Sequence, residues 1–324
     1  MPEVEGNGNA PIPAPFPFVV GCGRSGTTLL RAMLDSHPVI AVPPESHFIP
    51  HFARRHRRYE RGGALALDVL LADLAENRWF RRWGLEPAAV RAALEEAAPT
   101  DLTAGLRSLY GHYAQHQGKL RHADKTPPYV MHIPLLARLF PEAVFVHLIR
   151  DGRDVALSLM RASFGPDDFT SAVLTWRRSV QRGRAGGRGL PVGRYLELRY
   201  EDLVEDPERE LRRVGRLARF AYSPSMLDYH RGAADLLAGV GSPDQHQNLR
   251  QPPRAAAHDW RSRLTSQQRE EFEALAGGLR AELGYEPGVQ RLRVAVRASA
   301  AGRRAAMSAS HAGARAVKRL TRQG

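Results

Sequence analysis

Three consecutive segments near the start of the chain constrain the fold most. Phe16 to Val20 are apolar and favour a buried strand, whereas Thr27 to Ser36 place their leucines and methionine at helical spacing. Between them lies Gly21 to Thr28, with the sequence GCGRSGTT. This order predicts a strand, a tight loop and a helix whose first backbone amides can hold an anion.

The loop matches the spacing of triphosphate-binding loops, G-x-x-x-x-G-K-S/T, at every fixed position but one. Thr27 stands where the lysine belongs. That lysine serves the β- and γ-phosphates of a triphosphate, so a loop without it is poorly suited to ATP chemistry. Its amides still suit a smaller anion such as a 5′-phosphate bearing a sulfate, with Arg24 supplying a positive charge in fork geometry.

Further strands alternate with helices along the chain. Val144 to Ile149 predicts a second buried strand, and Tyr195 to Tyr200 predicts a third. Such alternation implies an α/β fold of the P-loop type, with three layers and a central parallel sheet flanked by helices. The expected helices run from Gly152 to about Arg161, from Asp168 to Arg184, from Asp206 to Phe220, and from the capping box of Thr265 and Gln268 to Leu283.

One large domain, residues 16–288, is expected from the length and the lack of a repeat. Residues 1–15 are rich in Pro, Gly and Asn and predict a flexible lead-in. Residues 51–118 are helical in pattern and Arg-rich, which predicts a helical insertion with helices near 64–76, 87–97 and 101–115. Residues 289–324 form a basic tail, for which a membrane-bound amphipathic helix and disorder are both open.

Charge and cysteine content limit which classes of binding partner and which cellular compartment fit this sequence. The net charge is +13, but residues 291–324 contain Lys and Arg and no Asp or Glu. The chain before Arg291 is therefore only mildly basic. This argues against a nucleic-acid-binding surface and favours local anion sites. The single cysteine, Cys22, forms no intrachain disulfide, and the apolar start is short and broken by prolines. We therefore expect a cytoplasmic protein without a signal peptide.

Two motifs together resemble the sulfotransferases that use 3′-phosphoadenosine 5′-phosphosulfate (PAPS), especially their tyrosylprotein and carbohydrate branches. The loop Arg24-Ser25-Gly26-Thr27-Thr28 is similar to the loop with which that family binds the 5′-phosphosulfate. Arg150 and Ser158 match the family's second signature, an Arg and a Ser across a strand-to-helix turn. The resemblance implies that Gly23 and this loop hold the 5′ side of PAPS, and that Arg150 and Ser158 hold its 3′-phosphate.

Weaker matches complete the site that the resemblance implies. Glu45 falls where the tyrosylprotein branch carries its proposed general base, and Lys125 in ADKTPP resembles a lysine that contacts the transferring group. Tyr200 in RYEDL resembles a nucleotide-side tyrosine, and Arg250 lies near a late basic residue of the 3′-phosphate side. The implied reaction is in-line transfer of a sulfuryl group from PAPS to an acceptor hydroxyl, with no metal required and residues 51–118 on the acceptor side.

Two residues are candidates for the base that takes the acceptor's proton. Glu45 follows two prolines, which should keep it extended, and a partly desolvated carboxylate can have its pKa raised toward neutrality. His47 would share that face if the segment is a strand, so it stays an alternative. Arg24 and Lys125 would stabilise the charge that develops on the bridging and sulfuryl oxygens.

The acceptor stays open among a peptide tyrosine, a carbohydrate and a small metabolite. The chain departs from the tyrosylprotein branch, because Gly23 replaces a common proline and because the sequence predicts neither the membrane anchor nor the disulfides of the eukaryotic enzymes. Two rival functions remain. One is a P-loop kinase or nucleotide hydrolase, which Thr27 disfavours. The other is a non-catalytic polyanion-binding protein that works through the basic tail.

Overall fold

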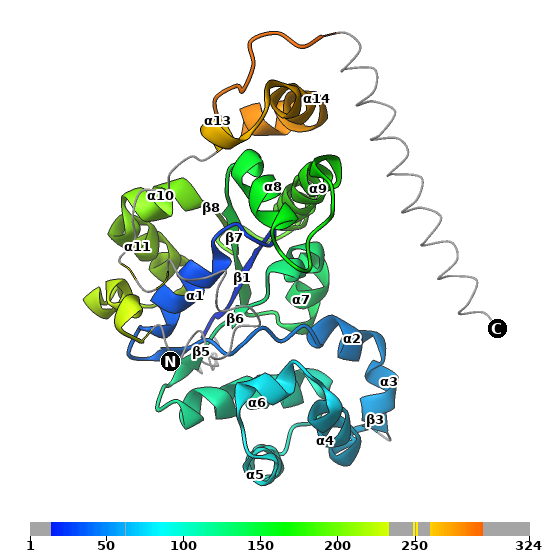
Figure 1. The fold of residues 1–324 in the computed structure, drawn as a ribbon. Coiled ribbons are helices and arrows are strands. Elements are labelled where there is room, and N and C mark those ends of the chain that lie inside the picture. The colour runs from blue at the N-terminus through cyan, green and yellow to red at the C-terminus, as the bar shows by residue number, and fades with distance from the viewer. Residues whose placement is uncertain (1–13, 62, 233–248, 250, 252–259, 294–324) are drawn as a thin grey trace, which may run out of the picture.

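The structure is a computed structural model that describes residues 14–61, 63–232, 249, 251 and 260–293. Within these residues the central sheet has four strands in the order β6-β1-β7-β8, and every neighbouring pair is parallel (Figure 1). The strands are β1 (Phe16–Gly21), β6 (Asp124–Lys125), β7 (Ala143–Ile149) and β8 (Tyr195–Arg199). The parallel sheet and three of its strands were predicted, whereas β6 was not.

The two faces of the sheet bury separate apolar clusters. Phe16 and Phe18 of β1 point into one cluster, while Val19 belongs to another. Every residue of β1 and β7 is buried, as expected for parallel strands that are covered on both faces. The apolar runs that predicted these strands therefore form the centre of the molecule.

Helices cover both faces of the sheet (Figure 1). On one side lie α1 and α11, and on the other lie α7 and α9, with α8 and α14 packed against α9. The capping box at Thr265 is present at the start of α14, as predicted. The bounds are α1 (Thr27–Asp35), α7 (Ile133–Leu139), α8 (Gly152–Met160), α9 (Phe169–Arg188), α11 (Pro207–Ala218) and α14 (Ser266–Glu282).

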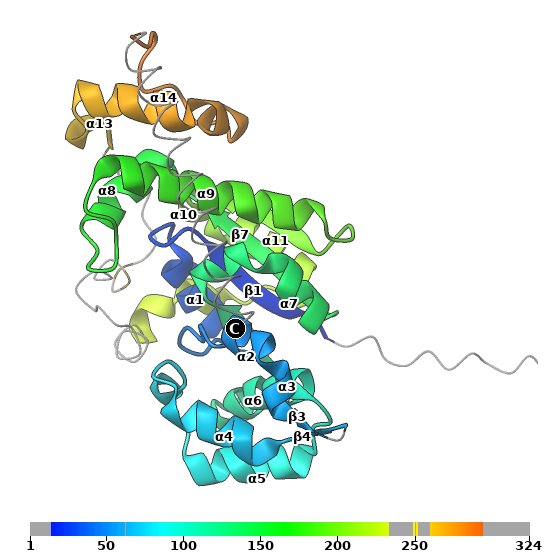
Figure 2. The ribbon, with the colours of Figure 1, turned by 90° about the vertical axis from the view of Figure 1, so that its right-hand side faces the viewer.

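The predicted helical insertion forms a lobe at one end of the sheet (Figure 2). Leu70, Leu106 and Tyr110 of this lobe share an apolar cluster with Phe16 and Phe18, so the lobe and the sheet have one continuous core. Its elements are α2 (Ile49–Arg54), α3 (His56–Tyr59), β3 (Glu60–Arg61), β4 (Ala64–Leu65), α4 (Leu67–Glu76), η1 (Phe80–Trp83), α5 (Pro87–Ala97) and α6 (Leu102–His116). The helix expected near residue 64 begins only at Leu67, because the hairpin of β3 and β4 precedes it.

Short elements connect these layers. Tyr200 opens a helix, α10 (Tyr200–Glu205), instead of ending the third strand as predicted. The remaining elements are β2 (Ile40–Ala41), which pairs with β5 (Arg121–His122), and η2 (Pro127–Met131), η3 (Pro224–Leu227), η4 (Tyr229–Gly232) and α13 (Trp260–Arg263). Among the described helices, none combines the length and the apolar character that crossing a membrane requires.

Candidate active site

The candidate residues gather where the parallel strands end. The loop after β1, the turn after β7 and the first residue of α10 all follow the carboxyl end of a strand, and Lys125 closes β6. Because parallel strands end at the same edge of a sheet, these segments meet there, which is where ligands bind in open α/β folds. The fold therefore brings together motifs that lie far apart in the sequence.

Glycine is required at Gly21, where a Cβ atom would lie 2.5 Å from the Leu148 backbone oxygen, and at Gly26. Gly26 has φ 92° and caps the N-terminus of α1, and a Cβ atom built on it would lie 2.3 Å from the ring of Tyr200. A Cβ atom on Gly23 would lie 3.6 Å from Phe164, which is an ordinary contact. Thr27 and Thr28 follow in the first turn of the helix and are buried. The loop thus places Tyr200 directly against the start of α1.

Two guanidinium groups lie close together here, one from Arg24 of the loop and one from Arg150 of the turn after β7. Arg24 Nε donates a hydrogen bond to Ser158 Oγ at 3.1 Å, which joins the two predicted signatures. The Arg150 guanidinium lies 4.6 Å from the centre of the Tyr200 ring. Burial, followed by the like charges of Arg150 and Arg161, lowers the pKa of Arg24. The positive potential at this edge is therefore high, and sequence reasoning had missed the part that Arg161 plays in it.

Two buried polar atoms of the loop and the turn after β7 lack a hydrogen-bond partner within the described part of the chain. They are Ser25 Oγ and Arg150 Nε. The neighbouring acids do not serve Arg150, because Asp151 Oδ2 pairs with Arg153 at 2.6 Å and Asp154 Oδ1 accepts from the Trp260 backbone N–H at 3.0 Å. Buried polar groups are normally satisfied, so two unmatched donors beside a helix N-terminus fit a bound anion.

Glu45, His47 and Lys125 form a second group next to the first. Lys125 Nζ donates to Glu45 Oε1 at 2.5 Å, and the Nε2 atom of His47 lies 2.8 Å from Glu45 Oε2. Glu45 lies in a non-helical segment after β2, as expected, but the segment is not a strand. His47 has φ 52°, so the premise that it shares a strand face with Glu45 is wrong, and a turn brings its ring onto the carboxylate instead.

The Glu45 carboxyl is held ionised. Burial raises its pKa, but the Lys125 charge, the His47 hydrogen bond and the Lys125 hydrogen bond outweigh burial and lower it to about 2. The expectation that burial would bring this pKa toward neutrality is therefore wrong for the free protein. For the Lys125 ammonium, burial instead lowers the pKa, and the Glu45 charge opposes that effect.

A buried polar network fixes the Glu45 segment to the sheet. Ser46 Oγ donates to Asp124 Oδ2 at 2.8 Å, and the hydroxyls of Tyr110 and Thr126 donate to the same oxygen at 2.6 and 3.2 Å. The Ser46 backbone N–H donates to Thr126 Oγ1 at 3.0 Å. Since Ser46 precedes His47 and Asp124 precedes Lys125, this network sets how the Glu45 segment meets β6.

The helical lobe reaches this second group through Trp79. The Trp79 ring centre lies 4.0 Å from that of His47, and the guanidinium groups of Arg78 and Arg82 lie 4.8 and 4.6 Å from the Trp79 ring centre. Asn77 Oδ1 accepts from the backbone N–H groups of Trp79 and Phe80, which anchors the turn. The lobe therefore provides an aromatic and cationic wall beside Glu45, which sequence reasoning had not identified.

The sequence singles out two further residues. Cys22 is buried among apolar side chains, and burial raises the pKa of its thiol to about 12. It therefore packs as a small apolar residue. Arg250, predicted for the 3′-phosphate side, lies outside the described residues.

Comparison with known proteins shows what the sequence and the fold are similar to. Residues 15–224, more than half of the chain, match the sequence profile of the sulfotransferase family. Protein-tyrosine sulfotransferase 1 of Danio rerio is 25% identical over 284 residues, covering 83% of this chain and 72% of that protein. Nodulation protein NoeE of Sinorhizobium fredii is 28% identical over 303 residues, covering 85% and 67%. The sulfotransferase domain of the Synechococcus PCC 7002 olefin synthase superposes with a TM-score of 0.57 at 28% identity, covering 82% and 93%.

Proposed function

The chain belongs to the sulfotransferase family, and we propose that it binds PAPS at the carboxyl edge of its sheet and transfers the sulfuryl group to an acceptor hydroxyl. The observation that carries this proposal is a pair of buried donors that find no partner among the described residues, Ser25 Oγ and Arg150 Nε. They lie beside the N-terminus of α1 and next to Arg24. A ligand with two separate anionic groups would satisfy both.

The two signatures divide the donor between them. The loop from Gly23 to Thr28 and the Arg24 guanidinium would hold the 5′-phosphosulfate, because helix N-terminal amides and arginine both favour phosphate oxygens. Arg150 and Ser158 would hold the 3′-phosphate, and Tyr200 would support Arg150 from below its guanidinium plane. The hydrogen bond between Arg24 and Ser158 supports this arrangement, since it joins a residue of one proposed subsite to a residue of the other.

The chemistry would run between the two groups of residues. Glu45 accepts the proton of the acceptor hydroxyl while the hydroxyl oxygen forms a bond to sulfur. The bond between sulfur and the bridging oxygen breaks, and its electron pair leaves with 3′-phosphoadenosine 5′-phosphate (PAP). Lys125 and Arg24 offset the negative charge that develops on the bridging and sulfuryl oxygens. No other residue of the two groups has to change its protonation state in this step.

Lys125 links donor binding to the strength of the base. In the free protein its charge is the main cause that lowers the Glu45 pKa, and burial is the cause that raises it. A sulfuryl group that competes for Lys125 would weaken the first cause and leave the second. Glu45 would then become a stronger base once the donor is bound, which is the state in which its base strength is needed.

The acceptor is defined only as a hydroxyl. Protein-tyrosine sulfotransferases among the relatives support a peptide tyrosine as the first class to test, with glycans and small metabolites as alternatives. The Trp79 wall beside His47 supports an acceptor that enters from the helical lobe, since an aromatic ring and two guanidinium groups suit a ring-bearing or anionic ligand.

Binding of PAP, the spent donor, tests the donor site directly. Calorimetry without magnesium should show that PAP binds the wild type, and Arg150→Ala should weaken binding by roughly a hundredfold because a charge-assisted contact to the 3′-phosphate is lost. AMP lacks that phosphate and should bind weakly and equally to both proteins. Folded wild-type protein that ignores PAP would contradict the proposal, and magnesium-dependent ATP turnover would favour a kinase or hydrolase.

The pH dependence of turnover tests the coupling of Glu45 to Lys125. The base form is the carboxylate, so activity is lost as the pH falls through the Glu45 pKa, which is about 2 in the free protein. Between about pH 4 and 6 the wild-type kcat/KM should therefore show no loss caused by Glu45. Lys125→Met removes the largest lowering cause, so burial should raise the pKa and move the acidic limb upward.

A matched lysine variant serves as the control for Lys125→Met. Lys119 pairs with Asp35 instead of Glu45, so Lys119→Met should keep the wild-type profile. The kcat/KM values for PAPS are measured against pH for all three proteins at limiting PAPS, because this ratio reports the groups of the donor-free enzyme. Identical acidic limbs in the wild type and Lys125→Met would show that Lys125 does not control the base.

A further inference from the structure

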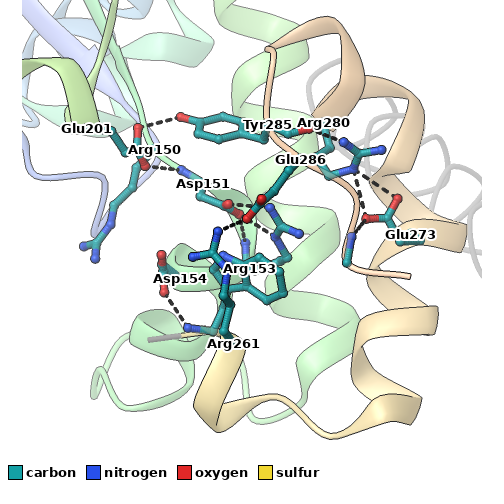
Figure 3. Close-up of polar contacts among 12 residues, drawn as sticks. Arg150, Asp151, Arg153, Asp154, Glu201, Arg261, Glu273, Arg280, Tyr285 and Glu286 are labelled. Carbon is teal, nitrogen blue, oxygen red and sulfur yellow. Dashed lines mark hydrogen bonds and ion pairs between the residues drawn. The ribbon is translucent and has the colours of Figure 1, made fainter. Parts of the chain in front are cut away.

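The C-terminal segment, residues 260–288, packs against the turn that carries Arg150 (Figure 3). The Trp260 backbone N–H donates to Asp154 Oδ1 at 3.0 Å, and the Arg153 guanidinium lies 3.6 Å from the centre of the Trp260 ring. Arg153 is itself fixed by two hydrogen bonds to Asp151, at 2.9 and 2.6 Å. Trp260 therefore holds the first turn of α8, which follows Arg150.

Glu201 holds the same turn at Asp151. Its Oε1 atom accepts from the Asp151 backbone N–H at 3.0 Å, and its Oε2 atom accepts from the Tyr285 hydroxyl at 2.8 Å. The Glu201 side chain is 11% exposed, and Tyr285 is buried. One carboxylate thus bridges the residue after Arg150 and a tyrosine from beyond α14 (Figure 3).

The neighbours of this bridge belong to the donor site. Asp151 follows Arg150, and Glu201 follows Tyr200, so the hydrogen bond between Asp151 and Glu201 joins the backbones next to both partners of the Arg150–Tyr200 stack. Tyr200 in turn lies against Gly26 of the loop. Any shift of Glu201 would therefore move the guanidinium relative to the loop.

We propose that Glu201 is a positioning residue for the 3′-phosphate subsite, with Tyr285 as its support. The C-terminal segment then belongs functionally to the donor site, although the match to the family profile ends at residue 224. The inference rests on the proposed function, because it needs PAP to bind next to Arg150. Glu201 contacts no substrate in this role and acts through Asp151 and Tyr200.

The direction in which PAP affinity changes in Glu201→Ala distinguishes a positioning role from a purely electrostatic one. Glu201 is an anion close to a site that would bind phosphate, so removing its charge alone should strengthen PAP binding. Positioning has the opposite consequence, since Arg150 loses its fixed orientation. Weaker binding in Glu201→Ala therefore cannot be produced by the change in charge.

Four variants test the inference by PAP calorimetry, at a temperature well below unfolding. Glu201→Ala should weaken PAP binding roughly tenfold, because one backbone hydrogen bond and one hydroxyl hydrogen bond that fix the turn are lost. Glu201→Gln should restore most of the affinity, since its carbonyl oxygen still accepts from Asp151 and its amide donates to the Tyr285 oxygen. Tyr285→Phe should fall between Glu201→Ala and the wild type.

Glu273→Gln is the matched control. Glu273 bonds Arg280 and the Gly288 backbone within the same C-terminal segment but not the Arg150 turn, so this variant should keep wild-type affinity. Unchanged or tighter PAP binding in both Glu201→Ala and Tyr285→Phe would overturn the inference while the proposed function stands. The same holds if Glu273→Gln loses as much affinity as Glu201→Ala. If the wild type itself does not bind PAP, the proposed function and the inference fail together.

Discussion

Glu45→Gln is expected to lower kcat roughly a thousandfold while PAP affinity stays within a few-fold of the wild type. The amide has nearly the same shape and still accepts a hydrogen bond from Lys125, but it cannot take the acceptor's proton. Turnover is measured with radiolabelled PAPS and a tyrosine-containing peptide, and PAP affinity by calorimetry. The separation of these two readouts identifies loss of the base rather than loss of the site.

His47→Ala is the variant that distinguishes the two candidate bases. His47 bonds the oxygen of Glu45 that Lys125 does not contact, so its removal should alter the orientation of the carboxylate and cost less than tenfold in kcat. A loss in His47→Ala as large as that in Glu45→Gln, or a Glu45→Gln enzyme with nearly full activity, would transfer the role of the base to the histidine.

Gly26→Ala is expected to reduce PAP affinity more than a hundredfold and to lower the melting temperature by several degrees. An alanine at φ 92° costs about 1–2 kcal/mol, and its Cβ atom would lie 2.3 Å from the Tyr200 ring. The ring, or the start of α1, must then move. Both Tyr200 and the first amides of α1 belong to the proposed donor site, so either movement should disrupt it.

Gly23→Ala provides the comparison within the same loop. Its Cβ atom would meet Phe164 at 3.6 Å, an ordinary contact, so affinity and melting temperature should stay close to those of the wild type. Calorimetry and thermal unfolding of the two variants side by side make the test. Equal losses at both positions would mean that the loop tolerates no side chain at all, and would remove the special role given to the Gly26–Tyr200 contact.

The sequence predicted the parts of the fold whose signals are local. Strands β1 and β7 are buried on both faces, so each appears in the sequence as a short continuous apolar run that predicts a strand. Strand β6 escaped prediction because it consists of Asp124 and Lys125, two charged residues that only the tertiary structure buries. A pattern search for strands rejects such a pair, although it forms the edge of the sheet next to β1.

The same distinction applies to the candidate site. Arg24 and Ser158 belong to motifs with a fixed spacing, and the structure brings them within hydrogen-bond distance. Glu201 and Tyr285 are 84 residues apart, and no spacing rule connects them. The Glu45 pKa was misjudged for a related reason, because its direction depends on a lysine whose distance the sequence does not give.

The buried thiol of Cys22 makes this chain convenient for fluorescence labelling. It is the sole cysteine, and a thiol with a pKa near 12 in an apolar cluster reacts poorly with maleimides. A cysteine introduced at Phe164, which is 66% exposed and faces Gly23 of the loop, would then carry the dye alone. The native protein therefore serves as a background without a reactive cysteine for following the loop after β1 in solution.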